Sequence, residues 1–394
     1  MKKKGIFGLP RNVTLLGWTS LFTDAGSEMI LPILPLFLKG ALGAPMVAIG
    51  IIEGVAEATA NFLRLGSGFF ADRIGKSKPL VFAGYALSAV VKPLLALVPT
   101  WHFVLGVRFA DRVGKGIRSA PRDSLVASST PKGIMGKAFG FHRSMDTAGA
   151  IIGSGVAMAA MLWVTDIKSP GIRWLFAASA IPCLLALIFI SFVKEKPARS
   201  AIPGKKPLVS NPFALPAQVW LLLAGIALWE LGNISYAFIL IRLTDLGVPV
   251  RIVPVVYFAY NIVYTLVAMP IGMAADRIGI RASLLLAPLL GAAAFVTMGF
   301  PGHWLIVVPG MLLFALHSAA VNTVPRFAIG RLAPSSARGT SFGMVGVCAL
   351  LGNTLAGVLW QKYGSGAAMQ IAGSLSLLAL VPFLLLRAKT PPGK

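Results

Sequence analysis

The chain has 394 residues, of which 56% are hydrophobic and only 12% are charged. A soluble domain carries about a quarter charged residues, so this composition excludes an ordinary soluble protein. The formal net charge of +23 would suggest a nucleic-acid partner for a soluble protein. In a membrane protein, such a charge can instead come from basic loops on the cytoplasmic side.

Apolar stretches long enough to cross about 30 Å of hydrocarbon recur along the whole chain. Polar breaks divide them into twelve predicted membrane spans, which makes this an all-α membrane protein. The spans cover residues 12–38, 46–71, 79–99, 101–120, 136–164, 172–193, 216–245, 250–275, 282–300, 303–326, 338–361 and 366–387. The first span follows a basic N-terminus, but it holds Asp24 and Glu28 and exceeds the apolar length of a signal peptide, so we interpret it as uncleaved.

Most of the 36 Lys and Arg residues lie in the two termini and in one alternating set of loops. The positive-inside rule makes these segments cytoplasmic, so both termini are predicted inside a multi-pass protein of the inner (plasma) membrane. Topology alone then explains the excess charge, and no nucleic-acid partner is expected. The basic, proline-rich segment 193–216 is predicted to be a cytoplasmic linker between an N-terminal six-helix bundle (1–192) and a C-terminal one (217–394).

Four landmarks of the first half recur in the second half, in the same order and at a nearly constant spacing. They are Asp24-x-Gly26 with Glu230-x-Gly232, Gly68 and Asp72-Arg73 with Gly272 and Asp276-Arg277, Pro121-Arg122 with Pro325-Arg326, and Phe139-Gly140 with Phe342-Gly343. The chain is therefore a duplicated six-helix unit. Internal repeats of this kind are common in transporters.

These features resemble the major facilitator superfamily over essentially the whole chain. The family has twelve helices in two six-helix halves and a glycine-rich charged loop after the second helix. Here that loop and its copy contain Gly68, Asp72, Arg73, Gly75 and Lys76, then Gly272, Asp276, Arg277, Gly279 and Arg281. The resemblance implies two pseudo-symmetric six-helix bundles that rock about a central site.

The resemblance also implies a role for the repeated loop as a conformational latch. Asp72 would pair with Arg118 or Arg122 at the end of the fourth span while the cytoplasmic side is closed. Gly75 and Gly279 would supply the sharp turns, since glycine adopts the necessary backbone angles without strain. The alternative is a basic inside loop with no such pairing.

The chain matches one shorter family signature fully and a second one only in part. Arg112 and Gly116 match the signature of the fourth helix. Gly149 and Gly153 match the glycine spacing that many proton antiporters have in the fifth helix, but Ser154 stands where those proteins have proline. This departure weakens the antiporter interpretation without excluding it.

Several acids fall within predicted spans, where each costs a few kcal/mol unless it faces a cavity or a partner. They are Asp24, Glu28, Glu53, Glu57, Asp146 and Glu230. Burial can raise the pKa of a carboxyl by several units, which suits a group that loads and releases a proton. Asp24, Glu28 and Asp146 are the candidates for proton coupling, and the alternative for each acid is a fixed ion pair, as between Arg143 and Asp146 or Glu57 and Arg64.

Polar side chains at helical spacing predict the substrate cavity. Arg108 and Arg112 lie too far from the helix end to reach the membrane surface, so they must meet a cavity, a carboxylate or a substrate. A guanidinium binds a carboxylate or phosphate through two parallel hydrogen bonds, which predicts an anionic or strongly polar oxygen group on the substrate. The other cavity candidates are His142, Arg143, Glu230, Asn233, Tyr236, Tyr257, Tyr260, Asn261 and Tyr264. His317 and Asn322 are weaker candidates.

No phosphate-binding loop that would bind ATP and no His/Cys metal cluster is present in the sequence, so no cofactor or metal is expected and a proton gradient is the expected energy source. We therefore predict a monomeric secondary transporter, not an enzyme, that exports a small organic solute in exchange for protons. The first alternative is proton-coupled uptake of an organic anion or metal chelate. A lipid flippase and a non-transporting membrane sensor are further alternatives.

The predicted topology can be tested with a Ser200→Cys variant in a chain whose Cys183 and Cys348 are replaced by alanine. A membrane-impermeant thiol reagent should label this cysteine only after the cells are opened. Lys168→Cys, in a predicted outer loop, is the control that should react in intact cells. Labelling of Ser200→Cys in intact cells would reverse the orientation.

Overall fold

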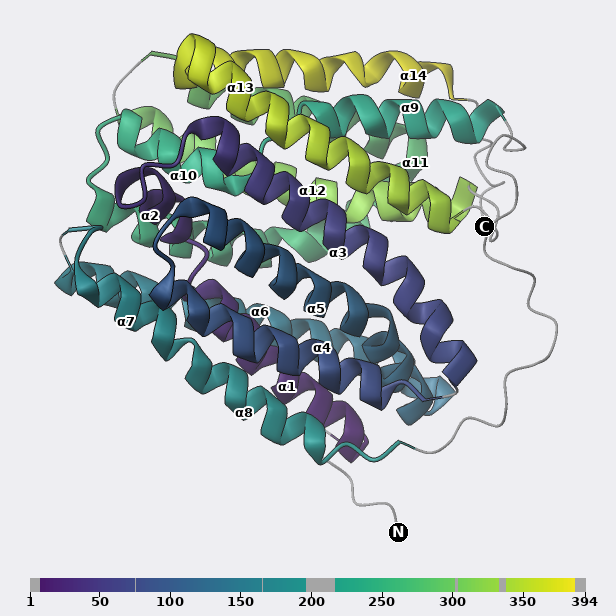
Figure 1. The fold of residues 1–394 in the computed structure, drawn as a ribbon. Helices are drawn as coiled ribbons and strands as arrows, with labels where there is room; N and C mark the ends of the chain where they lie inside the picture. The colour runs from purple at the N-terminus through teal and green to yellow at the C-terminus, as the bar shows by residue number, and fades with distance from the viewer. Residues whose placement is uncertain are drawn as a thin grey trace. The chain divides into compact units, whose positions relative to one another are not determined.

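The computed structural model describes residues 8–74, 76–164, 166–195, 217–301, 304–332 and 338–386. Within these ranges the chain forms helices joined by short turns, and no β-strand occurs among the described residues (Figure 1). The predicted all-α class is confirmed.

Helices follow one another closely along both halves of the chain. Those of the first half are α1 (Arg11–Glu28), α2 (Leu34–Gly40), α3 (Met46–Ile74), α4 (Lys78–Val91), the 3-10 segment η2 (Lys92–Leu97), α5 (Trp101–Ser129), α6 (Met135–Trp163), α7 (Pro170–Ala178) and α8 (Ala180–Ser191). Those of the second half are α9 (Ala217–Leu231), α10 (Tyr236–Asp245), α11 (Val253–Gly299), α12 (Val307–Leu332), α13 (Arg338–Leu378) and α14 (Leu380–Leu385). Each predicted span coincides with one helix, with part of one, or with two consecutive segments.

The differences between spans and helices have local causes. The first span is broken into α1 and α2 by a turn at residues 29–33. Helix α11 covers most of two spans, and α13 covers one span and the start of the next, which continues into α14. The chain turns between the spans at Gly279 (φ 84°) and Gly364 (φ 83°). These positive φ angles are accessible to glycine without strain. Helix α5 runs beyond the predicted end at residue 120, because Leu125 and Val126 in its last turns are buried in a hydrophobic cluster.

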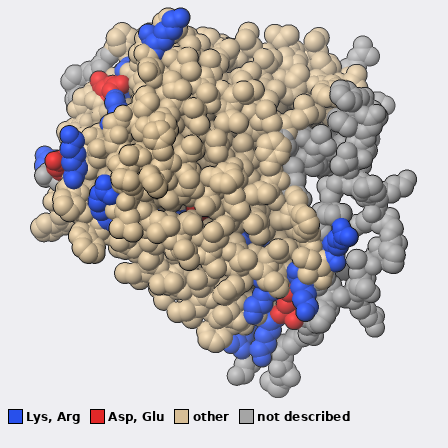
Figure 2. All heavy atoms as spheres, viewed as in Figure 1, with Lys and Arg blue, Asp and Glu red and all other residues tan. Residues whose placement is uncertain are grey.

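Among the described residues, nine helical stretches are long and apolar enough to cross a membrane. One of them, Met344–Leu385, covers most of two predicted spans, whereas the broken first span and the charged α5 fall outside the nine. Large apolar side chains are exposed on these helices, including Trp163 and Met269 at 89% and 72% exposure. Charged side chains are sparse on the face seen in Figure 2. Such a surface suits contact with hydrocarbon.

The chain divides into two compact units. Unit 1 comprises Met1–Gly43, Thr59–Lys205 and Val250–Phe258, and unit 2 comprises Ala44–Ala58, Lys206–Pro249 and Ala259–Lys394. The start of α3 is thus grouped with unit 2 and the start of α11 with unit 1. The sequence-based boundaries at 192 and 217 stay a prediction, and residues 196–216 of the proposed linker lie outside the described residues.

Helices α1 and α6 of unit 1 pack with their backbones in contact. A Cβ atom at Gly149 would collide with the carbonyl oxygen of Leu21, and one at Gly153 would collide with that of Ala25. Next to them, the buried Ser154 hydroxyl donates a hydrogen bond of 2.7 Å to the Ala150 carbonyl of its own helix. The glycines at the signature spacing therefore allow the close approach, and serine in place of proline leaves α6 continuous.

This close contact predicts unequal effects of alanine substitutions within α6. Gly153→Ala should destabilise the protein by about 1–3 kcal/mol, because overpacking a tight contact forces the backbones apart. Gly140→Ala in the same helix is the matched control, since nothing lies within 4 Å of the new Cβ atom. Thermal unfolding in detergent measures both variants, and equal unfolding temperatures would contradict the packing argument.

Candidate functional site

A pocket in unit 1 is lined mainly by ionisable side chains from α1, η2 and α5. Its volume is about 60 Å³. The acids are Asp24, Glu28 and Asp111, and the bases are Lys92, Arg108, Arg112, Lys115 and Arg118. The structure thus brings the predicted proton-coupling residues of the first span together with the predicted cavity arginines of the fourth.

Helix α5 supplies most of the charge because its ionisable residues recur every three or four positions and so share one face. Arg108, Asp111 and Arg118 are buried. The buried Nε atom of Arg112 has no hydrogen-bond partner within the described part of the chain. The face therefore presents guanidinium groups to the pocket, and that of Arg112 keeps a donor available for a ligand.

Lys92 and Asp111 form a buried ion pair at the wall of this pocket. Their charged atoms are 3.7 Å apart, and their side chains are only 4% and 11% exposed. Lys92 Nζ also donates a 2.7 Å hydrogen bond to the Ser27 hydroxyl, which ties η2 to α1. From the sequence spacing, Asp111 is expected to pair with a neighbouring arginine of its own helix. The spacing does not indicate the ion pair with Lys92 of η2.

Arg118 and Arg122, the predicted latch partners of Asp72, have other contacts in this structure. The Arg118 guanidinium donates to the Ser88 hydroxyl at 2.6 Å and to the Gly84 carbonyl at 3.3 Å. Arg122 donates to Asp123 at 3.1 Å and to the Ser20 hydroxyl at 3.3 Å. Gly75 and the side chains of Asp72 and Asp276 lie outside the described residues, so the latch pairing stays a prediction.

The other latch residues occupy comparable places in the two halves. A methyl group at Gly68 would lie 3.4 Å from the Cβ atom of Ala120 in α5, and one at Gly272 would lie 3.8 Å from Thr323 in α12. The bases of both loops are exposed. These are Arg73, Lys76, Arg277 and Arg281. The two loops therefore share their packing, as expected of a duplication.

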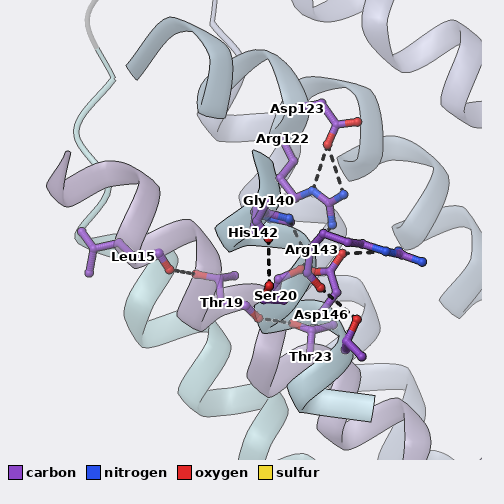
Figure 3. A network of polar contacts seen from close by, with 12 residues as sticks. Leu15, Thr19, Ser20, Thr23, Arg122, Asp123, Gly140, His142, Arg143 and Asp146 are labelled. Carbon is purple, nitrogen blue, oxygen red and sulfur yellow. Dashed lines mark hydrogen bonds and ion pairs between the residues drawn. The ribbon is translucent and has the colours of Figure 1, made fainter. Parts of the chain in front are cut away.

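Asp146 of α6 is held by two bases of its own helix (Figure 3). One Asp146 oxygen lies 3.5 Å from Nδ1 of His142, and the other lies 3.8 Å from the Arg143 guanidinium. Asp24 of α1 is within electrostatic reach of Asp146 and of Arg122. The structure thus links Asp24 and Asp146, two of the three predicted proton-coupling acids, through shared electrostatics.

Glu28, the third of these acids, accepts a 2.9 Å hydrogen bond from the Tyr257 hydroxyl. Tyr257 is buried, and its backbone belongs to the part of α11 that is grouped with unit 1. This contact joins a predicted proton-coupling residue to a predicted cavity residue.

The remaining cavity candidates lie in unit 2. Glu230 of α9 accepts a 3.0 Å hydrogen bond from the Asn233 amide, whose oxygen is 3.1 Å from Nε2 of His317 on α12. Tyr260 stacks between Tyr264 and Phe314, with ring centroids 6.2 and 5.4 Å away. Asn261 is buried, and Tyr236 is half-buried. His317 stands out in the sequence only because it lies in an apolar run, and this is a weak signal for a polar contact.

No group of three or more His, Cys, Asp or Glu side chains is placed to hold a metal ion within the described ranges.

The family model of the Major Facilitator Superfamily matches residues 16–241 and 220–394. The chain belongs to this family. It is therefore a multi-pass membrane protein of a transporter family rather than an enzyme, as the sequence predicts. An uncharacterised transporter of this type from Methanocaldococcus jannaschii is 32% identical over 388 residues, covering 94% of this chain and 95% of the relative.

Other relatives are more distant or match a shorter part of the chain. A protein from Mycobacterium tuberculosis strain H37Rv is 30% identical over 96% of this chain and 93% of its own length. The multidrug resistance protein MdtH of Yersinia enterocolitica is 26% identical over only 34% of this chain and 33% of its own.

Solved structures share the fold at low sequence identity. The nucleoside transporter NupG superposes with a TM-score of 0.79 and 15% identity, covering 96% of this chain and all of that one. A POT family transporter in complex with 5-aminolevulinic acid has a TM-score of 0.79 and 13% identity, covering 98% of each chain. These similarities show that the chain has the same fold as these transporters.

The buried Lys92–Asp111 pair predicts a large loss of stability when one partner is removed. Lys92→Met or Asp111→Asn should each cost about 3–5 kcal/mol, because a lone buried charge remains. The double variant should recover part of this loss. Arg64→Met is the control, since the Arg64–Asp123 pair is 42% and 36% exposed and such pairs contribute about 0–1 kcal/mol.

A double-mutant cycle on unfolding in detergent gives the coupling energy of Lys92 and Asp111. Additive effects of the two substitutions would mean that the ion pair does not stabilise the protein.

Proposed function

We propose that the protein is a proton-coupled secondary transporter and that the pocket of unit 1 binds an anionic group of a small organic solute. The observation that carries this proposal is the lining of the pocket, in which bases outnumber acids five to three. Membership in the Major Facilitator Superfamily supports movement of a small solute across a membrane by alternating access. The inner membrane and cytoplasmic termini belong to the same proposal.

The chemistry of the bases favours a carboxylate or phosphate on the solute. Guanidinium groups bind such oxygens through paired hydrogen bonds, which are stronger than bonds between neutral groups. Arg108 and Arg112 lie one turn apart on the same face of α5, so both can approach one bound group. A purely cationic solute would be repelled by this lining.

The same charges suggest how protons and solute are coupled. Protonation of Asp24 or Glu28 removes negative charge from the pocket and strengthens its attraction for an anion. Binding of the anion neutralises nearby bases and in turn favours protonation. Because the two binding events reinforce each other, they support movement of proton and anion in the same direction.

Proton-driven efflux is the second candidate. It is the direction predicted from the family resemblance, and the similarity of one third of the chain to a multidrug resistance protein supports it. In an exchanger, a solute and a proton compete for the same acids. A cationic or neutral solute would fit that scheme better than the anion favoured by the pocket.

The proposal predicts that full-length protein in liposomes accumulates organic anions when the external solution is made more acidic than the interior. Arg112→Lys should lower anion transport about tenfold, because lysine keeps the charge but loses the paired hydrogen bonds, worth about 1.5 kcal/mol. A panel of radiolabelled carboxylates, phosphate esters and organic cations measures this. Arg251→Lys, at an exposed arginine, is the matched control.

Outward movement of cations driven by the same acid-outside gradient, in exchange for entering protons and unaffected by Arg112→Lys, would favour the efflux candidate. Transport without any dependence on the pH gradient would contradict proton coupling in either direction.

A further inference from the structure

A buried polar chain in unit 2 is not used by the transport mechanism proposed above. It consists of Glu230, Asn233 and His317, which are linked by contacts of 3.0 and 3.1 Å and join α9 to α12. Glu230 is 6% exposed and His317 is 1% exposed. A buried carboxylate and a buried imidazole are thus connected through one half-buried amide.

Aromatic packing fixes the imidazole at one end of this chain. The His317 ring lies 5.2 Å from the ring of Phe295 and 6.0 Å from that of Trp229, measured between centroids. A Cβ atom at Gly291 would come within 2.6 Å of the imidazole, so the backbone of α11, the helix that also carries Phe295, approaches the ring closely. His317 therefore has little freedom to turn away from Asn233.

The indole N–H of Trp229 lies in the same cluster and is buried. It has no hydrogen-bond partner among the described residues. This leaves an additional donor beside the chain.

The charges around Glu230 differ from those around Asp24. Glu57 of α3 and Cys348 of α13 interact electrostatically with Glu230, and neither is a base. Asp24, in contrast, has the bases Lys115, Arg118 and Arg122 among its electrostatic neighbours, beside the acid Asp146. A buried carboxylate is costly when it is ionised without a cation, whereas its protonated form is neutral and can donate a hydrogen bond.

We propose that the Glu230–Asn233–His317 chain is a proton-holding site of unit 2, with the proton on Glu230 at neutral pH. This site is separate from the acids of the unit 1 pocket. Its use during transport rests on the proton-coupled function proposed above, but its protonation can be measured without transport.

The central amide lets the proton occupy either end of the chain. In the structure the Asn233 NH₂ donates to Oε2 of Glu230 and the Asn233 oxygen faces Nε2 of His317, an arrangement that serves an ionised carboxylate and also a protonated one that accepts through its carbonyl oxygen. If the amide turns over, the protonated carboxyl donates to the amide oxygen and the NH₂ donates to an unprotonated Nε2. Transfer from imidazolium to carboxylate breaks one N–H bond, forms one O–H bond and leaves two neutral groups.

Infrared difference spectroscopy of the purified full-length protein tests this proposal. At neutral pH the wild type should show the C=O stretch of a buried protonated carboxyl, shifted in D₂O, and Glu230→Gln should abolish it. Asp123→Asn is the control and should leave this band in place, because Arg64 and Arg122 pair with that carboxylate. His317→Gln should shift the band, whereas His142→Gln in unit 1 should not.

Titration of the wild type gives a second measurement that needs no variant. The band should disappear as the pH is raised, together with a change in histidine absorption. A band that persists in folded Glu230→Gln, or its absence from the wild type at neutral pH, would overturn the proposal. If the wild type shows this band but does not transport solute in response to a pH gradient, only the proposed function is contradicted.

Discussion

The arrangement of unit 1 depends on the cost of placing charge where water is scarce. Helix α5 carries acids and bases through a part of the chain predicted to span the membrane, and each must be compensated by a neighbour. Asp111 is compensated by Lys92, and Arg118 by a carbonyl, a hydroxyl and the face of Tyr85, 4.6 Å from its guanidinium carbon. These contacts hold η2, α4 and α5 together, and the charges left over form the pocket.

Unit 2 meets the same requirement by a different route. Its buried acid at Glu230 is joined to an amide and an imidazole, while Arg242 donates to the carbonyl oxygens of Met298 and Phe300 at 2.8 and 3.0 Å. The two halves of the repeat thus differ in their buried polar side chains, although both are built from helices in the same order. A basic interior suits an anion, and a chain of carboxyl, amide and imidazole groups suits a neutral proton carrier.

Sequence reasoning succeeded where the signal is local or repeated. Apolar length located the spans, and helical spacing placed Arg108 and Arg112 on the face that meets Asp24 and Glu28. It could not find Lys92–Asp111 or His317–Asn233, because these contacts join residues far apart in the chain and a single polar residue in an apolar run does not indicate its partner. The break at residues 29–33 contains Pro32, and proline within a helix indicates such a bend. Polar residues near the end of α5 conceal the buried Leu125, so the extension of this helix could not be predicted.

The break between α1 and α2 lies at the edge of the charged pocket. The α1 part of the first span is anchored by its glycine-mediated contact with α6, and it ends at Glu28. The turn that follows is held by hydrogen bonds from Leu31 N–H to the Ser27 carbonyl and from Leu34 N–H to the Ile30 carbonyl. Ile30 and Leu31 of this turn line the pocket next to Asp24 and Glu28. The change of direction in the first span therefore gives a cavity lined by charge one apolar wall.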